Sequence, residues 1–149
     1  MEFSPSDIIL NSRDENREKE CAKYLRSLPT NERYPFLWEV LKSKDNLTQL
    51  AGCRLVSRSV QENDFIYELL NYALENCDVS TIGFWLVPCL DVMGVKRTIE
   101  HLIRKNDNYP VLVNAACYKL HWHLQGKPKK DLLLLEKLSN ACSFDRSSL

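Results

Sequence analysis

The chain has 149 residues, of which 44% are hydrophobic and 27% are charged, and it is long enough to form one domain with a hydrophobic core. Twenty lysines and arginines balance 20 aspartates and glutamates, so the formal net charge is zero. This balance argues against a general nucleic-acid binder, which usually carries a basic excess. No run of about 18 apolar residues occurs, so we expect no membrane-spanning segment. The first residues lack a basic stretch followed by an apolar core, and we expect no signal peptide.

Six cysteines are spread along the chain, and none of them forms a Cys-x-x-Cys pair. Most lie in apolar, helix-like surroundings, where a thiol behaves as a small hydrophobic side chain. A disulfide framework is the alternative, but such frameworks are typical of short, loop-rich secreted domains. We therefore expect reduced, buried cysteines and a cytoplasmic protein.

The first predicted helical segment covers residues 5–28. A run of mixed charge at 11–20 indicates either a solvated helix face or a break between two shorter helices, and we favour the break. Pro29 ends the segment. Apolar residues spaced three and four apart predict the next helices. They are expected at about 31–43, 47–60, 65–75, 79–93, 95–105, 109–125 (capped by Asp107 and Asn108, with Pro110 in its first turn) and 128–142, followed by a frayed tail at 143–149.

No stretch alternates apolar and polar residues in the way that a half-buried strand does, so we expect an all-α fold of about eight helices. The most apolar stretch is 77–94, which begins with Asp78 as a possible N-cap and ends on Gly94. Its body is apolar around the whole circumference, which is typical of a core helix. Pro88 lies in its middle and lacks the N–H that would bond to the Phe84 carbonyl, so we expect a kink or a break there.

Three turns share one pattern: an aliphatic residue, a charged residue, two variable residues and an aspartate. They are residues 41–45, 74–78 and 103–107. In each turn the aspartate is expected to cap the following helix. Gly94 and Gly126, 32 residues apart, are expected to end the second helix of successive pairs.

This pairing resembles the HEAT-like family of helical repeats. The resemblance implies a single domain over 1–149, built as a short right-handed α-solenoid of antiparallel helix pairs. It would consist of capping helices at 5–28, repeats at 31–61, 63–94 and 95–126, and a C-terminal capping helix at 128–142. The units are shorter than the roughly 40 residues of a typical HEAT repeat, and compact bacterial HEAT-like proteins are the better comparison. An irregular helical bundle is the alternative.

The sequence has no glycine-rich phosphate loop and no nucleophile elbow. His121 and His123 come nearest to a metal motif, but residues two apart on a helix point to different sides. We therefore expect no enzyme activity, no cofactor and no metal. A thiol–imidazole pair stays open, because cysteines and histidines both occur, although no spacing points to one. Lys127, Lys129 and Lys130 are interpreted as a solvated helix start.

Charge is distributed unevenly. Between Ser59 and Val95 the chain has no lysine or arginine but six acidic residues: Glu62, Asp64, Glu68, Glu75, Asp78 and Asp91. We expect this span to form an acidic surface with Tyr67, Tyr72 and Trp85 nearby, which would suit a basic protein partner. The alternative is that these acidic residues only cap helices and increase solubility.

These patterns predict a non-enzymatic protein-binding module. Small HEAT-like proteins of this kind resemble immunity proteins of bacterial toxin systems, and the resemblance implies a protein that binds and neutralises a cognate basic toxin, such as a nuclease. A scaffold for a protein or peptide is the first alternative, and a helical-repeat enzyme acting on nucleic acid is a less favoured one. The candidate partner-binding residues are those expected on exposed positions: Arg58, Glu68, Glu75, Trp85, Asp91, Lys119, His121 and His123.

Overall fold

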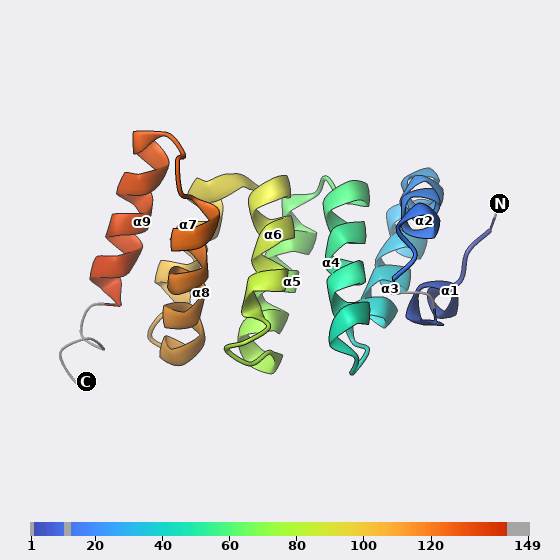
Figure 1. Ribbon diagram of the computed structural model, residues 1–149, viewed down its shortest axis with the longest axis horizontal. Helices are drawn as coiled ribbons and strands as arrows, with labels where there is room; N and C mark the ends of the chain where they lie inside the picture. The colour runs from blue at the N-terminus through green and yellow to red at the C-terminus, as the bar shows by residue number, and fades with distance from the viewer. Residues whose placement is uncertain (1, 11–12, 143–149) are drawn as a thin grey trace. The chain divides into compact units, whose positions relative to one another are not determined.

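The computed structural model describes residues 2–10 and 13–142, and every regular element in these ranges is an α-helix (Figure 1). This confirms the all-α prediction. The helices are α1 Pro5–Leu10, α2 Glu15–Ser27, α3 Thr30–Leu41, α4 Asn46–Ser59, α5 Asn63–Asn76, α6 Ile82–Val92, α7 Gly94–Lys105, α8 Pro110–His123 and α9 Lys129–Ala141. The chain divides into two compact units, Met1–Phe65 and Ile66–Leu149, with the boundary inside α5. The predicted frayed tail at 143–149 lies outside the described residues.

The break expected in the first helical segment is confirmed. Helix α1 ends at Leu10 and α2 begins at Glu15. Asp14 caps α2, because its Oδ1 accepts a hydrogen bond from the Arg17 backbone N–H at 3.1 Å. The described residues therefore contain nine helices, one more than a single first helix would produce.

In the first unit, α4 packs against both α2 and α3, and α1 packs against α3. Leu25, Leu37 and Leu55, one from each of α2, α3 and α4, are fully buried in its core. The core is extended by aromatic contacts, since Tyr34 lies with its ring centroid 4.6 Å from that of Phe65. Most of the apolar positions expected at helical spacing thus face inward in this unit, whereas Ile9 and Leu47 are exposed.

A buried carboxylate joins α2 to α4. Glu18 is only 3% exposed, and its oxygens accept hydrogen bonds from Arg54 Nε and Nη2 at 2.8 and 2.9 Å and from Arg58 Nη1 at 3.2 Å. The sequence predicts a break or a solvated helix face for the charged run at 11–20. Glu18 is an exception, because its side chain is buried. The partners lie 36 and 40 residues away in the sequence, so no local pattern points to them.

We expect Glu18→Gln to lower the free energy of unfolding by about 2 kcal/mol, because the neutral amide no longer pairs with two guanidinium groups. The loss is moderated because the Arg54 and Arg58 side chains are 35% and 37% exposed and stay partly hydrated. Urea denaturation measures the change. Glu20→Gln is the matched control, because Glu20 is exposed on the same helix. Equal stability of the two variants would contradict this role of Glu18.

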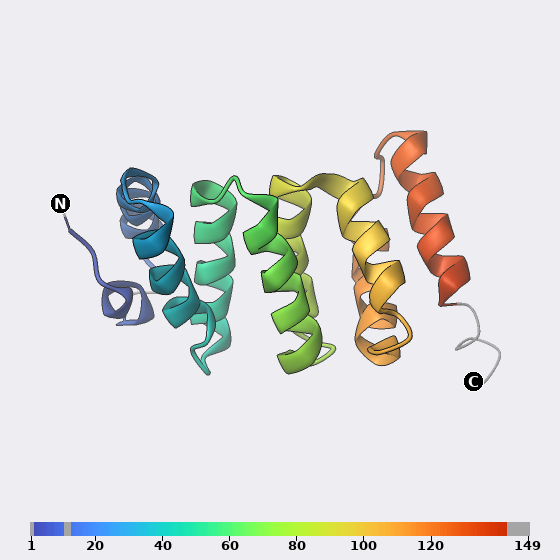
Figure 2. The same ribbon diagram turned by 180° about the vertical axis from the view of Figure 1, so that it is seen from behind.

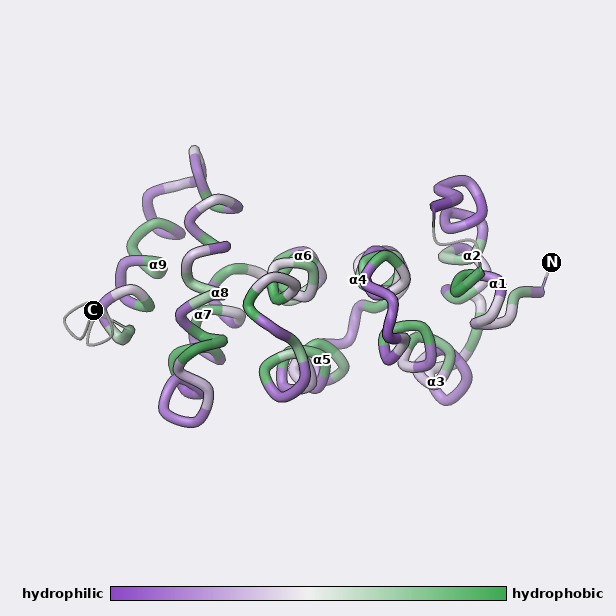
Figure 3. Tube along the Cα trace, turned by 60° about the horizontal axis from the view of Figure 1, so that its bottom comes forward, coloured by the Kyte–Doolittle hydropathy of each residue, from purple (hydrophilic) through white to green (hydrophobic). Residues whose placement is uncertain are grey.

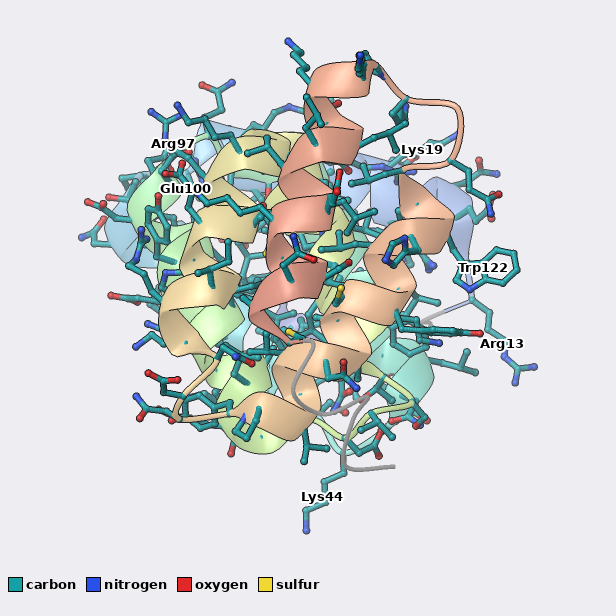
Figure 4. All side chains as sticks on the ribbon, turned by 90° about the vertical axis from the view of Figure 1, so that its left-hand side faces the viewer. Arg13, Lys19, Lys44, Arg97, Glu100 and Trp122 are labelled. Atoms are coloured by element: carbon teal, nitrogen blue, oxygen red, sulfur yellow. The ribbon has the colours of Figure 1, made fainter. Side chains whose placement is uncertain are left out.

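In the second unit, α6 packs against both α7 and α8 (Figures 1 and 2). His101 of α7 is bonded to Asn71 of α5, which places these two helices side by side. Helix α9 contacts both α7 and α8 and lies across the end of this unit (Figure 4). Leu86, Ile99 and Leu120 are fully buried among these helices.

The apolar stretch 77–94 forms α6, but the helix starts later than predicted. The Asp78 carboxylate accepts hydrogen bonds from the backbone N–H groups of Ser80 and Thr81, at 2.9 and 3.1 Å, and so closes a turn before the helix begins at Ile82. The helix continues through Pro88, so of the kink or break expected there the break is wrong. Hydrophobic residues follow one another along α6, whereas α2 is largely hydrophilic (Figure 3).

The three aspartate turns are not equivalent. Asp45 caps α4 as predicted, because its Oδ2 accepts the Thr48 backbone N–H at 3.0 Å. The cap position of α8 is Tyr109 rather than Asp107, and it has no side-chain cap bond. Gly94 directly follows Met93, the C-cap residue of α6, and has a φ angle of 88°, the left-handed region that suits the end of a helix, as expected. Gly126 also has a positive φ angle, 75°, but α8 ends at His123 with Leu124 as C-cap, so this glycine lies in the turn after the helix.

All six cysteines remain thiols; five of them are buried and Cys77 is half-buried. Burial raises the pKa of Cys21 to about 12 and that of Cys77 to about 11, so these thiols are not poised to ionise near neutral pH. The prediction of reduced cysteines packed as hydrophobic side chains is confirmed for the five buried ones. Across residues 2–10 and 13–142, no helix has both the length and the apolar character needed to cross a membrane.

Candidate protein-binding face

Trp85 is not on the surface. Its side chain is fully buried in the second unit, with its ring centroid 5.5 Å from that of Tyr72. The expectation that Trp85 contacts a partner is therefore wrong. The physical reason is that α6 is apolar on all sides, so the large indole is placed in the core with the rest of the helix.

The other charged candidates lie on different elements. Arg58 belongs to α4 in the first unit, where it contacts Glu18. Glu68 and Glu75 lie on exposed positions of α5, and Glu75 accepts a hydrogen bond from the Tyr109 hydroxyl at 3.2 Å. Asp91 is exposed near the end of α6.

Several residues of the acidic span also have partners within their own unit. Glu62 accepts a hydrogen bond from the Tyr34 hydroxyl and lies 3.5 Å from the Arg33 guanidinium. Asp78 closes the turn before α6. Part of the negative charge of the span is therefore used in local contacts. This agrees with the alternative, in which the acidic residues only cap helices and increase solubility.

Helix α8 is apolar on two sides. Val113, Ala116 and Leu120 face the core and are fully buried. A second row, which we call the α8 stripe, consists of Val111, Ala115, Tyr118 and Trp122. Its spacing of four, three and four residues places these side chains along one face of the helix. Val111 is 65% exposed, and Tyr118 and Trp122 are 61% exposed each.

Tyr118 and Trp122 form an aromatic pair at the surface. Their ring centroids are 6.5 Å apart and their planes are inclined by 69°, an edge-to-face arrangement. Figure 4 shows Trp122 pointing away from the helices beside α8. An apolar row on a helix is normally covered by another element, and the α8 stripe is an apolar row that is left uncovered.

Four of the candidates predicted from the sequence border this stripe. On the α6 side, the aliphatic part of the Lys119 side chain packs over Gly83. A Cβ atom added to this glycine would lie 3.4 Å from Cδ of Lys119. His123 and Asp91 line a hollow of about 300 Å³ on the same side. On the α9 side, His121 Nε2 lies 3.1 Å from Ser139 Oγ. The two histidines therefore point to different sides of α8, as their spacing predicted.

Cys117, His121 and Ser139 meet on the α9 side, and their geometry bears on the thiol–imidazole pair left open above. Ser139 Oγ donates to the Leu135 carbonyl at 3.0 Å, and it lies 3.4 Å from Cys117 Sγ and 3.1 Å from His121 Nε2. When the serine proton is directed at Leu135, the oxygen accepts from the thiol and the imidazole, and His121 is then a donor rather than a base.

Within residues 2–10 and 13–142, no three histidine, cysteine, aspartate or glutamate side chains lie close enough together to hold a metal ion. Comparisons with protein-family models, with curated proteins and with solved structures give no match to this chain. A role for the protein therefore has to be argued from its own surface.

The stripe residues Val111, Tyr118 and Trp122 are not among the binding residues predicted from the sequence, although the sequence contains a signal for them. Both the inward row and the outward row of α8 are apolar in the printed sequence. A helix with a second apolar row that no neighbouring helix covers indicates a binding face.

Proposed function

We propose that this chain is a non-enzymatic protein-binding module whose partner docks on the α8 stripe, with Tyr118 and Trp122 as anchors. The observation that supports it is the exposed apolar side of α8, which extends from Val111 to Trp122. Covering such side chains removes apolar surface from water, and tryptophan and tyrosine are the residue types that most often dominate binding energy. Lys119, Asp91 and the two histidines would form a polar rim around the anchors.

In its narrower form, the proposal keeps the hypothesis of a HEAT-like immunity protein that neutralises a basic toxin. Asp64, Glu68 and Glu75 support this form, because they are exposed on α5, a helix without lysine or arginine. A general scaffold is the second candidate, and the apolar α8 stripe favours it. Association with a basic toxin should slow markedly as salt is raised, whereas docking on apolar side chains alone should change little.

The proposal is tested by affinity capture from the cells in which the chain occurs, with quantitative mass spectrometry of the bound proteins. We expect Tyr118→Ser/Trp122→Ser to reduce recovery of a specific partner by at least about 30-fold, the loss that corresponds to a hot spot of roughly 2 kcal/mol. Equal recovery by wild type and this variant would contradict the proposed docking face.

The companion variant Glu68→Lys/Glu75→Lys separates the two forms of the proposal. It leaves the α8 stripe intact and reverses two charges on α5. Loss of the partner in this variant supports an electrostatic contact with a basic protein. Full retention, combined with loss in the stripe variant, contradicts the basic-toxin form and leaves the scaffold form standing.

A further inference from the structure

A second surface lies between α7 and α9, away from the α8 stripe. It is a groove of about 950 Å³ whose lining includes the apolar residues Met93, Val95, Leu133 and Leu134. Leu133 is 54% exposed, although leucines of this unit such as Leu135 and Leu138 are buried. The α7–α9 groove therefore contains uncovered apolar surface in a concave site, the shape that accepts inserted side chains.

The groove is also lined by four cations: Lys96, Arg97, Lys130 and Lys137. In the part of the chain that the structure describes, none of them forms an ion pair. This charge is independent of the acidic span, which ends before Val95. An occupant with negative charge would be attracted to this rim.

Figure 4 shows Arg97 and Glu100 beside α7 and Trp122 beside α8, on opposite sides of α9. Trp122 therefore lies away from the groove, although Val95 and Asp131 line both the groove and the hollow beside His123 and Asp91. Two acidic residues, Glu100 and Asp131, also line the groove. They would repel a densely charged polyphosphate but would tolerate a segment whose carboxylates are spaced to meet the cations.

We propose that the α7–α9 groove binds a peptide segment of a partner protein, in which apolar side chains are flanked by aspartates or glutamates. The apolar side chains would lie against Val95, Leu133 and Leu134, and the carboxylates would meet the cationic rim. The combination of apolar lining and unpaired cations favours this occupant over nucleic acid, which offers phosphates but few apolar side chains. The concave shape disfavours a flat bilayer, which is bound by protruding apolar groups. This site goes beyond the docking face on α8, and either one can fail without the other.

The test begins with a random 16-residue peptide library displayed on phage and selected on the full chain. We expect the enriched peptides to combine leucine, isoleucine or phenylalanine with aspartate or glutamate. The most enriched peptide is then synthesised with a fluorescent label, and its dissociation constant is measured by anisotropy. We expect Arg97→Glu/Lys137→Glu, and separately Leu133→Ser, to weaken its binding at least about tenfold.

The chain offers matched controls for both variants. Leu132 is 42% exposed and adjacent to Leu133 but lies outside the groove, and Lys129 is an exposed lysine of α9 that does not line it. Leu132→Ser and Lys129→Glu should therefore leave the dissociation constant within about twofold of wild type. Tyr118→Ser/Trp122→Ser should also leave it unchanged, which separates this site from the α8 stripe.

Selection of no peptide, or of basic peptides, would overturn the proposal. So would equal losses of affinity in Leu133→Ser and Leu132→Ser. Single-stranded DNA and phosphatidylserine vesicles are included as further probes. Binding of either that is tighter than peptide binding, and is abolished in Arg97→Glu/Lys137→Glu, would identify a polyanion site instead.

Discussion

Replacing Trp85 with alanine is expected to lower the free energy of unfolding by about 3–5 kcal/mol, the usual cost of removing a fully buried tryptophan. The indole is completely enclosed in the second unit and packs against the ring of Tyr72. Its removal leaves a large cavity among α6 and its neighbours. Thermal and urea denaturation of the full chain measure the change.

Two tryptophan controls separate a core role from a binding role. Trp85→Phe keeps an aromatic ring and removes an indole N–H that has no acceptor among the described residues, so it should cost clearly less than alanine. Trp122→Ala should change stability by no more than about 0.5 kcal/mol, because that side chain is exposed. A Trp85→Ala variant as stable as Trp122→Ala would contradict the buried placement.

Stability is also expected to fall as the pH is lowered, because of His101. Its Nε2 lies 2.7 Å from Asn71 Oδ1, and its Nδ1 lies 3.4 Å from Arg104 Nη2. The imidazole therefore donates from Nε2 and accepts at Nδ1, which describes the neutral ring. Burial, with the nearby charges of Arg104 and Lys105, lowers the pKa of His101 from 6.5 to about 4.

Between these two values the unfolded chain binds a proton at this histidine and the folded chain does not. The free energy of unfolding should therefore decrease as the pH falls through 6.5, and this contribution should level off below about 4. From about pH 7.5 to about pH 4.5 the loss due to His101 should reach about 2.5 kcal/mol.

The measurement is urea denaturation across this pH range for wild type and His101→Gln, since the difference between them removes the contribution of carboxylates. Arg104→Gln is the second control: without the guanidinium the pKa of His101 should rise, and the pH dependence should weaken. Identical pH profiles for wild type and His101→Gln would show that the ring is not held neutral in the folded chain.

The helices were largely predictable because apolar residues at helical spacing determine them. Helix α5, for example, was expected at 65–75 and spans Asn63–Asn76. The capping residues were less predictable, because several polar side chains near the start of a helix can accept hydrogen bonds from the same unpaired backbone N–H groups. Asp78 accepts hydrogen bonds from the backbone N–H groups of Ser80 and Thr81 in its turn, and Pro110 starts α8 without an aspartate cap.

Contacts between helices could not be read from local patterns. The pairing of Glu18 with Arg54 joins residues 36 positions apart, and nothing in the charged run distinguishes Glu18 from its exposed neighbours. Trp85 was assigned to a surface because acidic residues surround it in the sequence, although α6 was itself predicted as a core helix. The stripe on α8 was missed for a related reason, since an apolar row indicates burial until the fold shows which rows are covered.

Site-specific photo-crosslinking in the native cell tests the proposed docking face most directly. A benzoylphenylalanine side chain is placed at position 118 or 122 of the α8 stripe and, as a control, at position 20 on α2, where Glu20 is exposed. We expect one crosslinked partner from both stripe positions, with little or none from position 20. No crosslink from positions 118 and 122, or an equally strong one from position 20, would contradict the proposed docking face.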